Sequence, residues 1–240
     1  MIVLFTDFGL PYTGQMRSAL RQAGWQGDIV SLFDDVPSFD PKATAYLLSA
    51  YAADFPDNAV FVCVVDPGVG SDRAPIVVKA GEQWFVGPDN GLFEILLRRR
   101  EATTWRITWQ PDRLSASFHG RDLFAPVAAK LALGSDPTTI SKPYDPLRMD
   151  TWPDDLAEII YIDGFGNAMT GIRSETLSEG SEIEVSGQRV GFAKTFSNRE
   201  PGRAFWYKNA NGLVEISVNL GRADEELKLK PGNSLKILGK

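Results

Sequence analysis

Short apolar runs alternate with stretches of helical periodicity through residues 1–133 of the chain. Five runs rich in β-branched and aromatic residues predict buried strands, at Ile2–Phe5, Ile29–Phe33, Ala59–Val65, Ile76–Lys79 and Trp84–Val86. Strands that alternate with helices usually form a parallel sheet that is covered on both faces. The pattern therefore predicts an α/β N-terminal domain, residues 1–140, with a largely parallel central sheet.

Two of the predicted helices have recognisable ends. Asp40 and Pro41 supply an N-cap and a first-turn proline, and an apolar stripe follows at Ala43, Tyr46, Leu47, Ala50 and Tyr51. A second helix runs from Arg121, with Phe124, Val127, Ala128 and Leu131 on one face and Gly134 as its end. Pro126 must fall in the first turns of this helix, where a proline is tolerated.

The pattern changes near Gly134. Residues 134–155 are rich in Pro, Asp, Ser and Thr, and we place a linker at residues 141–155. Short runs separated by Gly and Asn turns follow, at Ile159–Ile162, Glu182–Val185, Val190–Ala193, Ala204–Tyr207 and Leu213–Val218. Their even spacing predicts a small all-β, barrel-like C-terminal domain over residues 156–240.

Composition narrows the function classes. The net charge of −6 argues against a nucleic-acid partner, because phosphate binding requires a basic surface. Cys63 is the single cysteine, which excludes a disulfide framework and a cysteine-based zinc site. No stretch approaches the roughly 20 apolar residues that span a bilayer, so we expect no membrane association and a cytoplasmic protein.

The only histidine, His119, and a strand that ends on a carboxylate are the strongest chemical signals. The run Ala59–Val65 leads into Asp66 and a glycine-rich turn that ends at Arg73. A buried strand that ends in this way places a reactive group at the carboxyl edge of an α/β sheet. Together these residues would form a small polar site for water or an anion. The alternative is a capping Asp66, a solvated Arg73 and a His119 with one structural hydrogen bond.

Other polar motifs allow two interpretations each. Asp7, at the end of the first strand, suits the vicinal hydroxyls of a ribose but equally a helix cap. Asn residues near Asp163–Asn167 and Asn209–Gly212 suit an adenine edge, although such sequences also form turns. Five aspartates stand at strand ends and motifs, at Asp7, Asp66, Asp89, Asp122 and Asp163, but no spacing matches a metal loop, and we predict no metal.

Five motifs in order resemble one family. They are Thr6-Asp7-Phe8-Gly9, Asp66-Pro67-Gly68-Val69-Gly70, Gly87-Pro88-Asp89-Asn90-Gly91, Phe118-His119-Gly120-Arg121-Asp122-Leu123-Phe124-Ala125-Pro126 and Phe165-Gly166-Asn167. The chain is similar to the S-adenosyl-L-methionine (SAM) hydrolases, or SAM hydroxide adenosyltransferases, which are relatives of the fluorinase and chlorinase. The resemblance runs from residue 1 to about residue 238.

The resemblance implies a homotrimer whose active sites lie between the N-terminal domain of one subunit and the C-terminal domain of the next. The family splits SAM into adenosine and L-methionine without a cofactor, with water attacking C5′ of the ribose. Its Asp, Arg and His set matches Asp66, Arg73 and His119. The halogenases lack this set and carry an extra loop where this chain has only Gly81-Glu82-Gln83.

The resemblance also implies binding roles. Asp7 would bind the ribose hydroxyls, Asp163 the methionine ammonium and Asn167 the adenine. The predicted substrate-binding set is completed by Phe118, Gly120, Phe196, Asn209 and Asn211. Two departures from the family pattern concern the methionine end: Ala210 stands where relatives often have Ser, and Gly171 lies in a run where Thr-Asn-Ile is commoner.

From these residues we expect Arg73 to stabilise hydroxide character while Asp66 and His119 hold and partly deprotonate the water. The alternatives are a non-catalytic SAM or adenosine binder, a halide-using SAM transferase and a metal-dependent phosphohydrolase.

Overall fold

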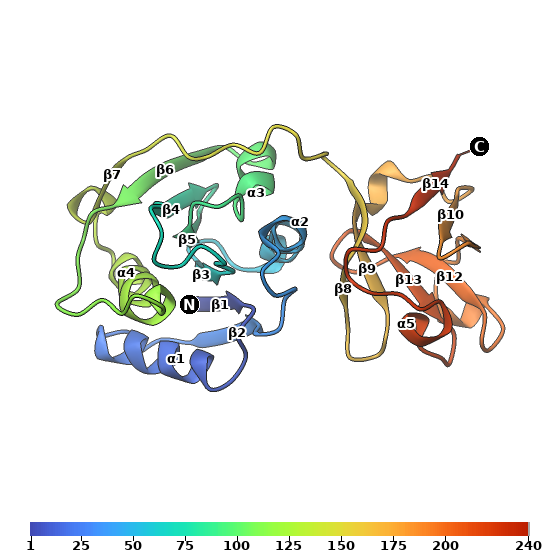
Figure 1. Cartoon of the computed structure of the whole chain (residues 1–240), viewed down its shortest axis with the longest axis horizontal. Coiled ribbons are helices and arrows are strands. Elements are labelled where there is room, and N and C mark those ends of the chain that lie inside the picture. Colours follow the sequence, from blue (N-terminus) through green and yellow to red (C-terminus); the bar gives the residue numbers. More distant parts are fainter. Residues whose placement is uncertain (240) are drawn as a thin grey trace. The chain divides into compact units, whose positions relative to one another are not determined.

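The computed structural model describes residues 1–239, which form two compact units (Figure 1). The first unit comprises Met1–Ser49 and Phe55–Asp150, and the second comprises Ala50–Asp54 and the chain from Thr151 onward. The short segment Ala50–Asp54 therefore belongs with the C-terminal part of the chain. No helix among the described residues is long and apolar enough to cross a membrane.

A seven-stranded sheet forms the centre of the first unit. Its strands are β1 (Ile2–Thr6), β2 (Ile29–Phe33), β3 (Val60–Val64), β4 (Pro75–Ala80), β5 (Gln83–Pro88), β6 (Ala102–Ile107) and β7 (Ser141–Pro143). The helices are α1 (Tyr12–Gln22), α2 (Pro41–Tyr51), α3 (Glu94–Arg99) and α4 (Ala125–Ala132), and a π-helical turn (Gly120–Phe124) precedes α4.

The sheet is mixed, with the order β2-β1-β3-β5-β4-β6-β7. Strands β2, β1, β3 and β5 pair in parallel, as the sequence pattern predicts. The prediction of a largely parallel sheet is wrong for β4, β6 and β7, which pair antiparallel. Only Gly81 and Glu82 connect β4 to β5, and a parallel pair would need a crossover of a dozen or more residues.

Helices cover both faces of this sheet, with α1 and α4 on one side and α2 and α3 on the other (Figure 1). Ile2, Leu4 and Val62 belong to a core cluster that includes α1 and α4. Phe61 alternates with Val62 and so faces the other way, where its ring stacks on Phe85 at 4.8 Å. Burial on both faces explains why the central strands are continuously apolar.

The predicted helix ends are confirmed. The Asp40 carboxylate accepts a hydrogen bond from the Ala43 amide (2.9 Å), which caps α2. Pro126 lies in the first turn of α4, and Gly134 follows the helix with a φ of +88°. The sequence pattern does not predict the π-helical turn directly after His119, and such turns occur often at functional sites.

The second unit consists mainly of two antiparallel sheets. A four-stranded sheet has the order β12-β13-β9-β8, and a three-stranded sheet has the order β11-β10-β14. Their strands are β8 (Leu156–Ile162), β9 (Ala168–Arg173), β10 (Glu182–Val185), β11 (Gln188–Gly191), β12 (Ala204–Lys208), β13 (Leu213–Val218) and β14 (Lys236–Leu238), and a short helix α5 spans Ala223–Glu226. Isolated bridges join the two sheets at both edges, between Glu158 and Ser234 and between Phe192 and Trp206.

Two buried carboxylates anchor the segment Tyr144–Met149, which we call the strap. Asp89, next to the end of β5, accepts hydrogen bonds from the Tyr144 hydroxyl (2.9 Å) and the Leu147 amide. Glu94, at the start of α3, accepts from Arg148 (3.0 Å) and the Met149 amide (3.1 Å). The turn motif around Asp89 thus fixes the last residues of the first unit.

The charge of Glu94 is expected to stabilise this unit. Burial raises the pKa of Glu94, but hydrogen bonds from Arg148, the Met149 amide and Arg98 outweigh burial and hold it below its ordinary value of 4.5. A carboxyl whose pKa is lower in the folded state stabilises the fold above its unfolded pKa and loses this contribution as the pH falls.

Glu94→Gln is therefore expected to lower the free energy of unfolding by about 2 kcal/mol at neutral pH. The difference from the wild type should be constant above pH 4.5 and shrink below it, as urea unfolding at a series of pH values would measure. Glu82→Gln, which breaks an exposed pair with Lys79, is the matched control and should change stability by less than about 1 kcal/mol. A difference at Glu94 that does not vary with pH would contradict the assignment.

Candidate active site

Arg73 and Asp66 form a nearly buried ion pair at the carboxyl edge of the parallel strands. The Arg73 Nε donates to both Asp66 oxygens, at 3.0 and 2.9 Å, and Nη2 donates to Oδ2. Their side chains are only 9% and 4% exposed. The interpretation of Arg73 as a solvated residue is therefore wrong.

The turn after β3 brings the two side chains together. The Ser71 hydroxyl donates to the Gly68 carbonyl (2.6 Å), which folds the segment back toward Asp66. Gly70 has a φ of +79°, and a Cβ there would lie 2.7 Å from the Ala116 carbonyl oxygen. Only glycine permits this close approach to the segment that leads into His119.

His119 contacts the same arginine, with Nη2 of Arg73 3.0 Å from its Nδ1. A guanidinium has only donors, so Nδ1 accepts and the neutral ring carries its proton on Nε2. Burial lowers the pKa of His119, and the positive charge of Arg73 lowers it further, against opposing effects of Asp66 and Asp122. The three residues thus form one hydrogen-bonded cluster, which we call the triad.

A cavity of about 330 Å³ in the first unit opens beside the triad. Its lining includes every residue of the first unit predicted to bind substrate, together with two triad members: Asp7, Asp66, Phe118, His119 and Gly120. Phe8 and Tyr12 join Phe118 in edge-to-face contacts with ring centroids 5.6–6.1 Å apart. Aromatic rings beside carboxylates suit a ligand with a flat ring and hydroxyl groups.

Asp7 lies at the carboxyl end of β1, the neighbour of β3 in the sheet. Its Oδ2 accepts a hydrogen bond from the Phe39 amide (3.1 Å). Burial raises the pKa of Asp7, a backbone hydrogen bond from Phe39 opposes this, and the nearby charge of Asp66 adds to it. The Phe39 amide that donates to Asp7 lies in a loop and not in a helix, and Asp7 is one of the residues that line the cavity.

The remaining predicted binding residues meet in a cavity of about 810 Å³ in the second unit. It is lined by Asp163, Asn167, Phe196, Asn209 and Asn211, among others. Asp163 organises its own loop, because Oδ1 accepts from the amides of Phe165 and Asn167 and Oδ2 accepts from the Asn167 side chain, each at 2.9 Å. The loop is thereby held with Asn167 at the cavity.

Glu215 is a buried carboxylate in this cavity that the sequence pattern does not reveal. It is 3% exposed and accepts hydrogen bonds from the Tyr207 hydroxyl and from Asn209 Nδ2 (2.8 Å). Burial raises the pKa of Glu215. Asn209 in turn accepts from the Asn211 and Leu213 amides (3.0 and 2.9 Å), so Glu215 fixes the turn that carries both asparagines.

The two departures from the family pattern have different positions. Ala210 lines the cavity, so a ligand there has no side-chain hydroxyl at this position to form a hydrogen bond with. Gly171 pairs with Leu156 in the sheet and is not among the cavity residues. A Cβ at Gly171 would lie 2.6 Å from that of Leu156, so any larger residue at this position would clash with the neighbouring strand.

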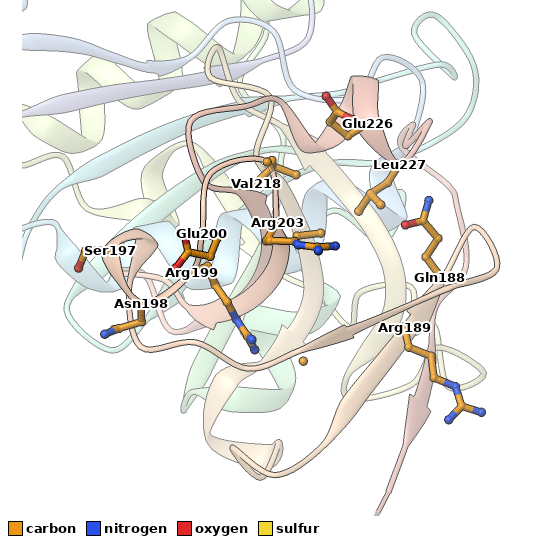
Figure 2. A pocket seen from close by; sticks show the side chains of 13 residues that line it. Gln188, Arg189, Ser197, Asn198, Arg199, Glu200, Arg203, Val218, Glu226 and Leu227 are labelled. Carbon is orange, nitrogen blue, oxygen red and sulfur yellow. The ribbon is translucent and has the colours of Figure 1, made fainter.

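Another cavity, of about 720 Å³, lies elsewhere on the second unit (Figure 2). Arg199 and Arg203 are among its lining residues, and none of the predicted site residues is. Residues 1–239 contain no group of three or more His, Cys, Asp or Glu side chains placed to hold a metal ion.

Comparison with known families decides the relationship. The sequence model of the SAM hydroxide adenosyltransferase N-terminal domain matches residues 2–141, and that of the C-terminal domain matches residues 157–236. The chain belongs to the SAM hydroxide adenosyltransferase family. The resemblance inferred from the five motifs is thereby confirmed.

Relatives of this family member match over nearly the whole chain. An (R)-S-adenosyl-L-methionine hydrolase of Thermus thermophilus is 35% identical over 99% of both chains. Another, of Salinispora arenicola, is 34% identical over 97% of this chain and 95% of its own. The crystal structure of an uncharacterized conserved protein from Thermotoga maritima superposes with a TM-score of 0.90 at 28% identity and covers all of both chains.

The charge of Arg73 is expected to control the protonation of His119. Arg73→Met should raise the pKa of His119, because a neighbouring positive charge is lost while Asp66 remains. Asp66→Asn should lower it, because the opposing negative charge is lost. The chain has one histidine, so a single ring proton signal followed by NMR against pH measures both shifts. Equal titration midpoints of His119 in the two variants would contradict the contact between His119 and the ion pair.

Proposed function

We propose that this chain hydrolyses SAM to adenosine and L-methionine. A water oxygen attacks C5′ of the ribose, the C5′–S bond breaks with its electron pair remaining on sulfur, and one proton is released. The leaving group is a neutral thioether, so the reaction needs an oriented nucleophile more than a general acid. The observation that carries the proposal is the triad, a compact Asp–Arg–His cluster beside a cavity in a family of SAM hydrolases.

Within the triad the three groups have different capacities. Arg73 supplies the donors and the positive charge that stabilise developing hydroxide. The Asp66 carboxylate has lone pairs left to accept a hydrogen bond from the water. His119 accepts from Arg73 through Nδ1, which supports a role for Nε2–H as a donor that orients the water. Partial deprotonation of the water, expected of Asp66 and His119 together, then falls to Asp66.

Binding of SAM is assigned to residues of both units. Asp7 would hold the ribose hydroxyls between the aromatic rings of the first cavity. Asn167 would contact the adenine, Asp163 the methionine ammonium and Phe196 the ligand's apolar surface. We assign catalysis to an N-terminal domain of residues 1–140 and part of SAM binding to a barrel-like domain of residues 156–240.

We propose a homotrimer in which each site combines the first unit of one subunit with the second unit of another. The two sets of lining residues support this, because each unit carries a separate cavity with part of the groups SAM requires. A cytoplasmic location and the lack of a nucleic-acid partner remain predictions from composition.

EDTA-treated protein is expected to convert SAM to equimolar adenosine and methionine. Chromatography measures both products. Arg73→Ala should lower kcat by roughly 100-fold or more, the usual effect of removing a group that stabilises developing negative charge. Arg17→Ala, a surface arginine of the same unit, is the matched control and should leave the rate unchanged. Saturable adenosine binding without turnover would replace the proposal with a SAM or adenosine binder.

Shared sites predict complementation between inactive variants. Arg73→Ala damages the first unit and Asn167→Ala damages the second. Coexpressed in equal amounts, they should recover about a quarter of the wild-type rate, because one interface in four then joins two intact units. Sites contained within single chains would give no recovery above the sum of the two variants. Sedimentation of the coexpressed protein measures the oligomeric state alongside.

A further inference from the structure

The triad stands between two cavities of the first unit. The first, of about 330 Å³, is the proposed seat of the ribose and is lined by Asp66 and His119. The second, of about 440 Å³, is lined by Arg73 and also by His119. The ion pair therefore has one partner on each side, and the imidazole borders both spaces.

The reaction consumes water, and the first cavity is poorly suited to supply that water while substrate is bound. Water must attack C5′ from the side opposite the sulfur, so it approaches from behind the bound ribose. A volume of 330 Å³ is near the lower end of the roughly 300–1,000 Å³ of small-molecule sites, so bound substrate leaves little space for solvent in this cavity.

We propose that the second cavity is the route by which water reaches the triad while SAM occupies the first. The inference rests on the proposed function, and it adds a path to the reacting centre that is separate from the substrate's own seat.

The lining of the second cavity supports this use. Ser71, Asp72, Arg106 and Gln110 supply hydroxyl, carboxylate, guanidinium and amide groups, which are partners for a chain of waters. Asp72, Gln110 and Leu114 are exposed, so the outer end of this cavity reaches the surface of the unit. Asp72, next in sequence to Arg73, adds a carboxylate that can accept hydrogen bonds from such waters.

Filling the route should slow the chemistry without weakening the ligand. Leu114→Trp and Gln110→Trp place a large ring in the second cavity from a loop that contributes no triad residue. Each is expected to lower kcat by about tenfold and to leave the affinity for adenosine, measured by calorimetry, within about twofold. Leu114→Ala is the matched control: it removes side-chain volume from the same cavity without removing a polar partner of the waters, and it should keep the wild-type kcat.

A small alcohol provides a readout that structural damage alone would not move. Methanol that reaches the triad would attack C5′ in place of water and give 5′-O-methyladenosine, methionine and one proton. Leu114→Ala should increase the methyl ether as a fraction of total product, and Leu114→Trp should decrease it.

Tryptophan variants with wild-type kcat and an unchanged methyl ether fraction would overturn the route. A parallel loss of adenosine affinity and kcat in both would also overturn it, because it would mean that the second cavity belongs to the substrate seat. A wild-type protein that fails to hydrolyse SAM would refute the proposed function itself, before either variant is compared.

Discussion

The Arg73–Asp66 pair is the interaction on which the candidate site depends. Both side chains are largely withdrawn from water, and either charge alone would be costly at that position, by about 3–5 kcal/mol when its partner is removed. The pair therefore constrains its surroundings: the turn must fold back tightly, Gly70 must pass close to Ala116, and His119 must present a lone pair to the guanidinium. Burial also keeps the positive charge effective, because little solvent screens it.

The second unit uses carboxylates in a different way. Asp163 and Glu215 accept hydrogen bonds mainly from neighbouring amides and a tyrosine, so each fixes the loop or turn that lines the larger cavity. Asn167 and Asn209 are consequently held in defined orientations before any ligand arrives. Such preorganisation reduces the conformational entropy lost on binding.

Much of this arrangement was predictable, and the failures have physical causes. Apolar runs identified the parallel strands β1, β3 and β5, which are buried on both faces, and also the edge strand β2, which is mostly half-buried. Strand β6 escaped prediction because its residues are mostly half-buried or exposed, and β9 is interrupted by Gly171. The motifs indicated which residues gather at the strand ends, whereas the bond from Arg73 to Nδ1 of His119 depends on a turn geometry that spacing does not encode. Glu215 was missed because it lies within an apolar strand, where a carboxylate is expected to point to solvent.

The strap has a practical meaning for recombining family members. Residues 144–149 look like flexible linker in the sequence, yet Asp89 and Glu94 bind them into the first unit. A chimera that takes its C-terminal part from another homologue at residue 141 would exchange the strap and leave two buried carboxylates facing foreign partners. A crossover after Asp150 keeps both anchoring carboxylates with their own strap, so it is the natural junction for joining the C-terminal part of a relative to the first unit of this chain.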